Sequence, residues 1–297
     1  MADRKQPPDL GFSRPNPMIW DGEEEAEGVF VGTAEGPELL GVPSLREAAA
    51  PKLPADFQPS PAVDRFFDAV GAALLRAADD PSGSPARFDL AALAPDERIV
   101  VGAILGDGDV SIVAGREPTY QVQESVLTGV WQIRGETDDG AIVMDQIEVG
   151  RIPSLVRDAA LSLAGLMPRS EAPLPEGVMN VGPVLAEIGA RSEAWRPGTA
   201  PHVLNFTLFP MTEADTAVLT ETLGQAPLTI VSGGFGTCRI MATRVRHVWA
   251  VQYLDAMSKP ILDTVEIGDV PEVACAAAED FAASATRLAT MMETYRS

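Results

Sequence analysis

The sequence predicts an α+β fold built from two tandem repeats related by a pseudo-twofold axis, preceded by a helix and an irregular N-terminal tail. Three observations predict it. The segments 129–153 and 247–271 align over 25 residues without a gap. The same succession of helix-like and strand-like patterns surrounds both segments. Residues 1–61 lack either periodicity and contain ten of the chain's 25 prolines.

The aligned segments share identical residues at a constant offset of 118 positions. The identical pairs are Val130 and Val248, Trp131 and Trp249, Asp145 and Asp263, Glu148 and Glu266, Gly150 and Gly268, and Pro153 and Pro271. Two copies are fewer than the roughly three that a solenoid needs. We therefore expect two half-domains that bury their sheets together, like a homodimer fused into one chain.

The segments ahead of the repeats differ from one another. Residues 1–60 are acidic and proline-rich, which predicts an irregular or disordered tail. Residues 61–80 are predicted to form a helix, because Ser60 can cap it and Pro61 suits its first turn. Its apolar residues recur at helical spacing. They are Val63, Phe66, Phe67, Val70 and Leu74.

Each repeat is predicted to run from a short strand and helix through an antiparallel meander to a closing helix. The first occupies 87–160 and the second 205–297, including a C-terminal helix; a connecting segment, 161–204, carries its own helix. Within them, 88–106 aligns with 206–224 as an extended stretch leading into a helix. Thr212 with Asp215 resembles a capping box, while Gly106 and Gly224 suit helix C-caps.

Composition excludes several classes of function. The formal net charge of −21 argues against nucleic acid and anionic membrane as partners, since both require a basic surface. We find neither a secretion signal nor an aliphatic run long enough for membrane insertion, so we expect a soluble cytoplasmic protein. Two cysteines provide no disulfide framework.

The repeated aromatic and acidic residues are expected to serve the fold first. Trp131 and Trp249 lie in apolar strand-like runs, where packing in the core is the favoured interpretation. Glu148 and Glu266 precede a Gly-x-(Ile/Val)-Pro turn, where a carboxylate can accept N–H bonds from the following helix. The alternative brings both glutamates together near the pseudo-twofold axis, to bind a cationic or amide group. A hydrolase-type enzyme would use the same pair, with Gln123.

The sequence predicts no catalytic residues, no bound metal and no cofactor. Ser232–Ile240 is glycine-rich, but it lies between strand-like runs and favours a hairpin over a phosphate-binding loop. Cys238 and Cys275 lack metal-site spacing to each other and to the two histidines, and buried thiols are the favoured interpretation. A small-ligand or iron–sulfur cluster-binding sensor or scaffold stays open, and it would need the two cysteines close together and accessible.

Several motifs in order carry a resemblance to a known family. They are LGDGDVSIV at 105–113, QVQESVLTGVW at 121–131, Asn205–Pro210, GFGTCRI at 234–240, VWAVQY at 248–253, DVPEV at 269–273 and the Ala278–Asp280 triplet. This pattern resembles the HupH/HyaF/HoxQ family of [NiFe]-hydrogenase assembly proteins, from about Phe88 to the C-terminal helix.

The resemblance implies a non-enzymatic assembly chaperone in hydrogenase maturation. Its implied partner is the [NiFe]-hydrogenase small-subunit precursor, before export, while iron–sulfur clusters are being installed; a thioredoxin-like hydrogenase chaperone often takes part. That precursor carries a basic twin-arginine signal peptide, which suits an acidic helper. Seven residues are nominated for partner binding, five from these motifs and the two repeated glutamates. They are Gln123, Glu124, Glu148, Phe235, Cys238, Arg239 and Glu266.

Overall fold

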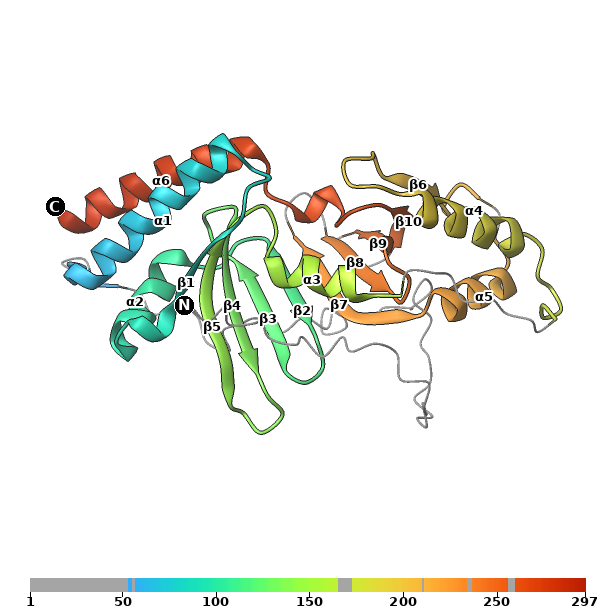
Figure 1. Ribbon diagram of the computed structural model, residues 1–297, viewed down its shortest axis with the longest axis horizontal. Coiled ribbons are helices and arrows are strands. Elements are labelled where there is room, and N and C mark those ends of the chain that lie inside the picture. The colour runs from blue at the N-terminus through green and yellow to red at the C-terminus, as the bar shows by residue number, and fades with distance from the viewer. Residues whose placement is uncertain (1–52, 55–56, 165–172, 210, 234–236, 256–259) are drawn as a thin grey trace, which may run out of the picture.

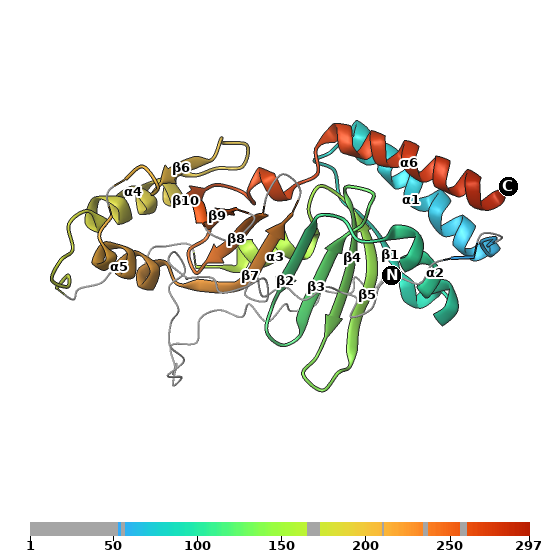
Figure 2. The same ribbon diagram turned by 180° about the vertical axis from the view of Figure 1, so that it is seen from behind.

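The structure is a computed structural model that describes residues 53–54, 57–164, 173–209, 211–233, 237–255 and 260–297. Over these residues the chain forms six α-helices and one ten-stranded antiparallel sheet, which confirms the predicted α+β class. The predicted tail, 1–60, falls mostly outside the described residues. The molecule is elongated, with helices at both ends of the sheet (Figures 1 and 2).

The ten strands span the whole length of the molecule. They are β1 Ala86–Asp89, β2 Val110–Ala114, β3 Thr119–Glu124, β4 Val130–Glu136, β5 Ile142–Val149, β6 His202–Asn205, β7 Gln225–Ser232, β8 Thr237–Thr243, β9 Val248–Leu254 and β10 Pro260–Ile267. The helices are α1 Pro61–Asp79, α2 Pro95–Leu105, α3 Ser154–Ser162, α4 Val181–Ala194, α5 Glu213–Leu223 and α6 Ala278–Arg296, with short 3-10 turns η2 Leu90–Ala92 and η3 Glu272–Ala274.

The strand order is β1-β5-β4-β3-β2-β7-β8-β9-β10-β6. In each half the first strand of the chain lies at the outer edge of the sheet. The other four follow inward in reverse chain order, as β5 to β2 in the first half and β10 to β7 in the second. The halves join at β2 and β7, where Ile112 pairs with Ile230, again 118 positions apart. The two-repeat hypothesis requires this equality of strand order.

The correspondence between the halves begins earlier in the chain than the sequence predicted. Val63 and Val70 of α1 are buried, and so are Val181 and Ile188 of α4, each 118 positions later. The helix assigned to a connecting segment therefore occupies the place in the second half that α1 has in the first. The C-terminal helix α6 packs along α1, at the end of the molecule formed by the first half (Figures 1 and 2).

One part of the predicted alignment is wrong by two residues. The sequence placed the extended stretch of the second copy at Phe206, whereas β6 ends at Asn205. Ala86 of β1 pairs with Val149, and His202 of β6 pairs with Ile267, so these strands correspond at an offset of 116. The loop between β6 and α5 is longer by two residues than the segment between β1 and α2.

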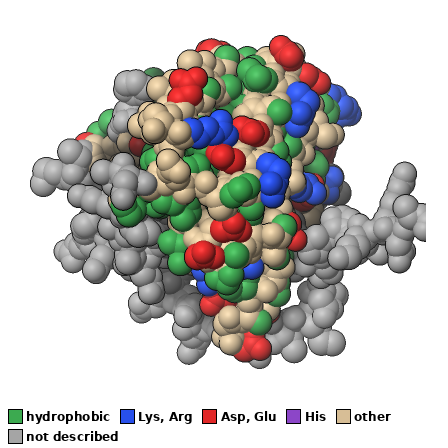
Figure 3. All heavy atoms as spheres, turned by 90° about the vertical axis from the view of Figure 1, so that its left-hand side faces the viewer, with side chains coloured by type: hydrophobic (Ala, Val, Ile, Leu, Met, Phe, Trp, Pro, Cys, Tyr) green, Lys and Arg blue, Asp and Glu red, His purple; other side chains and the backbone are tan. Residues whose placement is uncertain are grey.

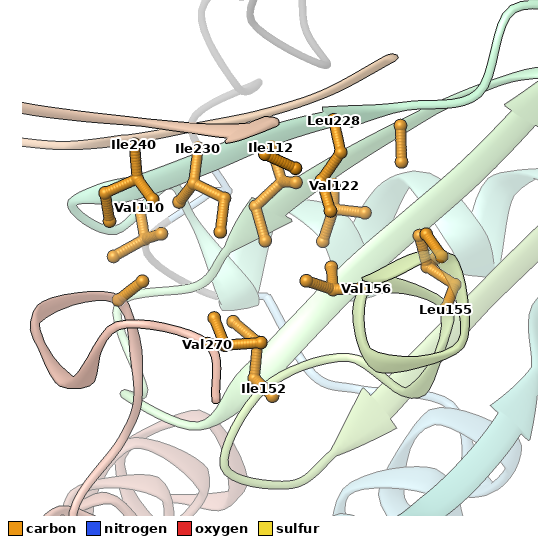
Figure 4. Packing of buried hydrophobic residues seen from close by; sticks show 14 of the residues in the cluster. Val110, Ile112, Val122, Ile152, Leu155, Val156, Leu228, Ile230, Ile240 and Val270 are labelled. Carbon is orange, nitrogen blue, oxygen red and sulfur yellow. The ribbon is translucent and has the colours of Figure 1, made fainter. Parts of the chain in front are cut away.

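The sheet buries three clusters of hydrophobic side chains. On one face, a central cluster lies beneath α3 and η3 and draws residues from both halves (Figure 4). Its members include Val110, Ile112, Val122, Ile152, Leu155, Val156, Leu228, Ile230, Ile240 and Val270. On the other face, α1, α2 and α6 cover the first half, while α4 and α5 cover the second.

An acidic residue links the helices within each half. Glu97 caps α2 at the Ala94 N–H and accepts a 2.5 Å hydrogen bond from Ser60, the N-cap of α1. Asp215, 118 positions later, closes the predicted capping box with Thr212. It also accepts three N–H bonds of 2.8–3.0 Å from residues 179–181, at the start of α4. Each carboxylate thereby orients two helices at once.

The end of the molecule made by α1, α2 and α6 carries acidic and basic side chains mixed among hydrophobic ones (Figure 3). Arg296 at the end of α6 forms ion pairs of 2.9 Å with Asp64 and Asp68 of α1. Charges of both signs are thus interspersed on this end of the first half, which gives it no single-sign field for a charged partner.

Candidate partner-binding site

The repeated tryptophans are core residues, as predicted. Trp131 is 0% exposed and Trp249 2% exposed, and both belong to the central cluster. The indole N–H of Trp131 donates to the Gly150 carbonyl at 2.8 Å. The indole nitrogen of Trp249 has no hydrogen-bond partner among the described residues. The two halves therefore share a packing role and differ in hydrogen bonding.

Glu148 is held entirely inside the first half. Its carboxylate is buried and accepts the Ser154 N–H at 2.6 Å and the Ser154 hydroxyl at 2.8 Å, at the start of α3. Arg87 of β1 donates to it at 3.2 Å. This is the predicted bond to the following helix, and it leaves the carboxylate committed to the fold.

Glu266 lies at the equivalent position but in different surroundings. Val203 stands opposite it in β6, where β1 has Arg87 opposite Glu148. The residue equivalent to Ser154 in the second half is Glu272, and it forms an ion pair with Arg151. Burial raises the pKa of the Glu266 carboxyl. Its side chain faces the Trp249 side of the sheet, where it raises the pKa of the Cys238 thiol further.

Gln123 and Glu124 hold the loops at one end of the first half. The Gln123 amide donates to the carbonyls of Gly108 and Val110 and accepts from Ser111. Glu124 accepts the Gly129 N–H at 3.2 Å, and burial raises its pKa to about 7. Gly129 has a φ of +85°, and a side chain there would collide with Phe281 of α6.

The remaining predicted residues lie around β8. Cys238 is 2% exposed in the central cluster, while Arg239, the next residue, points to the opposite face. Phe235 falls outside the described residues. Burial raises the pKa of Cys238 and Cys275 to about 12, so both are protonated thiols at neutral pH. A cluster-binding site needs accessible cysteines, and Cys238 is not accessible.

The predicted residues do not converge on one site. Cys238 and Glu266 face the central cluster, whereas Gln123 and Arg239 face the other side of the sheet. The structure instead shows a pocket that sequence reasoning missed, at the outer end of the second half. It has a volume of about 200 Å³. It is lined by Phe206, Thr207, Phe209, Met211, Thr216, Leu219 and Asp263.

Asp263 of β10 is the charged residue among those lining this pocket. Its Oδ1 is buried and has no hydrogen-bond partner among the described residues. Burial raises its pKa to about 7, and a hydrogen bond from Gln252 on β9 partly opposes this. An ionised carboxylate in such a place is unfavourable unless a cation or further donors approach it.

The loop after β6 builds the rim of the pocket. The Phe206 N–H donates to the Asp263 carbonyl at 2.9 Å, and the Asp263 N–H donates to the Thr207 hydroxyl at 3.0 Å. These two bonds fix the rim to the strand that carries the carboxylate. Leu208 is 83% exposed and Phe209 43% exposed, so the rim presents apolar side chains to solvent.

Comparison with known proteins gives the family. The model of the HupH hydrogenase expression protein C-terminal conserved region matches two stretches, 73–170 and 178–295, which together exceed half of the chain. The chain belongs to the HupH family of hydrogenase expression proteins. The two matched stretches contain the two halves of the sheet in turn.

Individual relatives agree with this membership. A hydrogenase expression/formation protein HupH of Rhizobium leguminosarum bv. viciae is 45% identical over 210 residues, 70% of this chain and 74% of that protein. HoxQ of Cupriavidus necator is 41% identical over 74% of this chain and 78% of its own length. The hydrogenase-1 operon protein HyaF of Escherichia coli K12 is 33% identical over 72% and 74%.

None of the helices within the described ranges is both long and apolar enough to cross a membrane. Among the same residues, no group of three or more histidine, cysteine or acidic side chains is placed to hold a metal ion.

Proposed function

We propose that this protein is a non-enzymatic assembly chaperone that binds the [NiFe]-hydrogenase small-subunit precursor before export, while its iron–sulfur clusters are being installed. The named relatives support a role in hydrogenase expression and formation. The specific client is our inference. A thioredoxin-like hydrogenase chaperone is proposed as a further participant.

The observation that carries a binding role is the surface at the β6 edge of the sheet. Two exposed apolar side chains, Leu208 and Phe209, belong to the loop after β6, beside the Asp263 pocket. Apolar anchors surrounded by polar groups are typical of protein-binding surfaces.

The threonine hydroxyls of the pocket are engaged within the fold. The Thr216 hydroxyl donates to the Thr212 carbonyl, and the Thr207 hydroxyl is engaged by the Asp263 N–H, so neither is paired with a base. A nucleophile needs a general base within hydrogen-bonding reach. Glu148 is likewise occupied by Ser154 and Arg87. These contacts support binding over hydrolysis.

The test is anaerobic co-purification of this protein with a tagged small-subunit precursor, with the large-subunit precursor as the comparison. We expect capture of the small subunit, and a loss on changing Leu208→Asp together with Phe209→Asp. The matched control is Leu75→Asp, an exposed apolar position on α1 (58% exposed) at the far end. Capture of the large subunit alone, or equal capture by the rim variant, would contradict the proposal.

We also propose that binding depends on the repeat-bearing region and not on the tail. Leu53 and Phe57 pack against the helices of the first half, Phe57 in edge contact with Tyr295. A deletion for this purpose should therefore end at residue 52. We expect the shortened protein to retain the client at about 0.15 M salt, where screening limits long-range attraction. Arg239→Glu should weaken capture more, once circular dichroism shows that it folds.

The equal strand orders lead us to propose a pseudo-twofold relation between the halves. We expect residues 95–160 to superpose on 213–278 in a crystal structure, with Trp131 on Trp249 and Glu148 on Glu266. A superposition that fails to align these pairs would refute the relation.

A further inference from the structure

The duplication provides an internal comparison for the Asp263 pocket. In the first half, Asp145 stands opposite Arg134 in the sheet, as Asp263 stands opposite Gln252 in the second. Arg98 of α2 also approaches Asp145, with 3.9 Å between guanidinium and carboxylate. The position of Arg98 in the second half is Thr216 of α5.

The two halves therefore share the carboxylate and differ in its cations. Burial raises the pKa of Asp145, while Arg98 and Arg134 both lower it. For Asp263, burial raises the pKa, and a hydrogen bond from Gln252 is the interaction that lowers it. Thr216, which lines the pocket, and Gln252 are both uncharged, so neither supplies Asp263 with the positive charge that Asp145 has nearby.

We propose that this pocket receives an arginine side chain of a partner protein, with Asp263 as its counter-ion. The inference rests on the proposed function for the source of the arginine. It goes further by naming the chemistry that the surface recognises.

The size and lining of the pocket fit one arginine side chain. A volume of about 200 Å³ is below the roughly 300–1,000 Å³ of sites for drug-sized ligands. Phe206 and Phe209 supply aromatic rings, on which a planar guanidinium stacks better than an ammonium. Asp263 lines the pocket with a carboxylate whose Oδ1 has no hydrogen-bond partner among the described residues, which suits a charge-assisted bond from one N–H of a guanidinium.

The surrounding charges also favour a cation. The other lining residues, from the loop after β6 and from α5, carry no titratable group. Arg239 follows Gln252 in the same row of the sheet, with its Nε buried and unpaired among the described residues, and it is not among the residues that line the pocket. The net charge of −21 attracts basic segments over longer range.

The first experiment uses the full chain and three short peptides. Ac-Gly-Arg-Gly-NH2 is the probe, and the matched peptides carry lysine or citrulline, which is close in shape to arginine but uncharged. Binding is followed by the amide NMR signals of Thr207 and Asp263. We expect the arginine peptide to shift these signals, the lysine peptide to bind more weakly and the citrulline peptide not to bind. Equal binding of any two peptides would overturn the assignment.

Three variants test the counter-ion. Asp263→Asn keeps the shape and should weaken the arginine peptide at least about tenfold, since losing one member of a desolvated charge pair is costly. Thr216→Arg reproduces the first half; it should abolish peptide binding and raise the urea midpoint. Asp145→Asn, the matched change in the first half, should bind as wild type. Wild-type affinity in Asp263→Asn or Thr216→Arg would refute the proposal.

Two further arms identify where the arginine comes from. If deleting residues 1–52 strengthens peptide binding, this chain's own tail is the occupant, and the partner assignment is overturned. Co-purification with the small-subunit precursor separates the two proposals. Equal capture by wild type and Asp263→Asn would refute the pocket and leave the client proposal standing. Peptide binding without capture of the precursor would support the pocket and refute the client proposal.

Discussion

The matched substitutions Trp131→Phe and Trp249→Phe measure one hydrogen bond in two equivalent places. Both rings are fully buried in the same cluster, so the loss of ring volume is shared. Trp131 alone donates to a carbonyl, that of Gly150, at 2.8 Å. The Trp249 N–H has no partner among the described residues, and removing it leaves no acceptor unpaired.

The expected difference follows from these contacts. An orphaned buried carbonyl costs about 1–3 kcal/mol. We therefore expect Trp131→Phe to be less stable than Trp249→Phe by about that amount. Alanine at either position should cost about 3–5 kcal/mol, because a large cavity forms in both cases.

The measurement is urea unfolding followed by far-UV circular dichroism, since tryptophan fluorescence changes in both variants. Equal m values are needed before the midpoints are compared. A difference below about 0.5 kcal/mol, the ordinary scatter of additivity, would refute the hydrogen-bond argument. A less stable Trp249→Phe would show that the indole N–H of Trp249 has a partner in solution.

Three other predictions concern titratable groups. Burial opposes ionisation of Asp215, but four backbone N–H bonds hold its pKa well below the usual range. Asp215→Asn should therefore lower the thermal midpoint more than Glu97→Gln does. Equal shifts of the midpoint would contradict this. Burial raises the pKa of Asp263 to about 7, above about 3.9 in the unfolded chain. Its contribution to stability is present below about pH 4 and is lost as the pH rises to about 7. The stability of Asp263→Asn relative to wild type should therefore increase over that interval, as measured by urea titrations at several pH values. Parallel pH dependences of the two proteins would contradict the raised pKa. Cys238, which is buried and has a pKa of about 12, should react with iodoacetamide at pH 8 only after unfolding, and the partly buried Cys275, whose pKa is also about 12, should react slowly. Rapid labelling of Cys238 in the native protein, followed by mass spectrometry, would contradict this.

The sequence was sufficient for the parts of the fold that local patterns determine. Glycines at the ends of α2 and α5 have the same φ of +56°, as C-caps at positions 106 and 224 require. Glu148, which precedes the Gly-x-Ile-Pro turn before α3, accepts the N–H bond from that helix that the sequence predicted. These features depend on a few neighbouring residues, so pattern and structure agree.

Other features depended on contacts across the chain. The start of α4 is held by Asp215 from α5, whereas α1 has Ser60 as its own cap, so the two helices show different sequence signals. Similarly, β6 was misplaced because 202–205 and 206–209 are both plausible short strands. Pairing with β10 selects the first, and this choice is made in the tertiary structure.

The candidate site shows what the repeat could have revealed and did not. At the offset of 118, Asp145 and Asp263 align as identical residues, a match that contains no information about their surroundings. The informative positions are Arg98 with Thr216 and Arg134 with Gln252, where they differ. They carry no signal in a single strand or helix, because a cation on α2 and one on β4 become partners of the same carboxylate only after the sheet forms. The acid that keeps its place while the cations around it differ is therefore the observation on which the proposed arginine site rests.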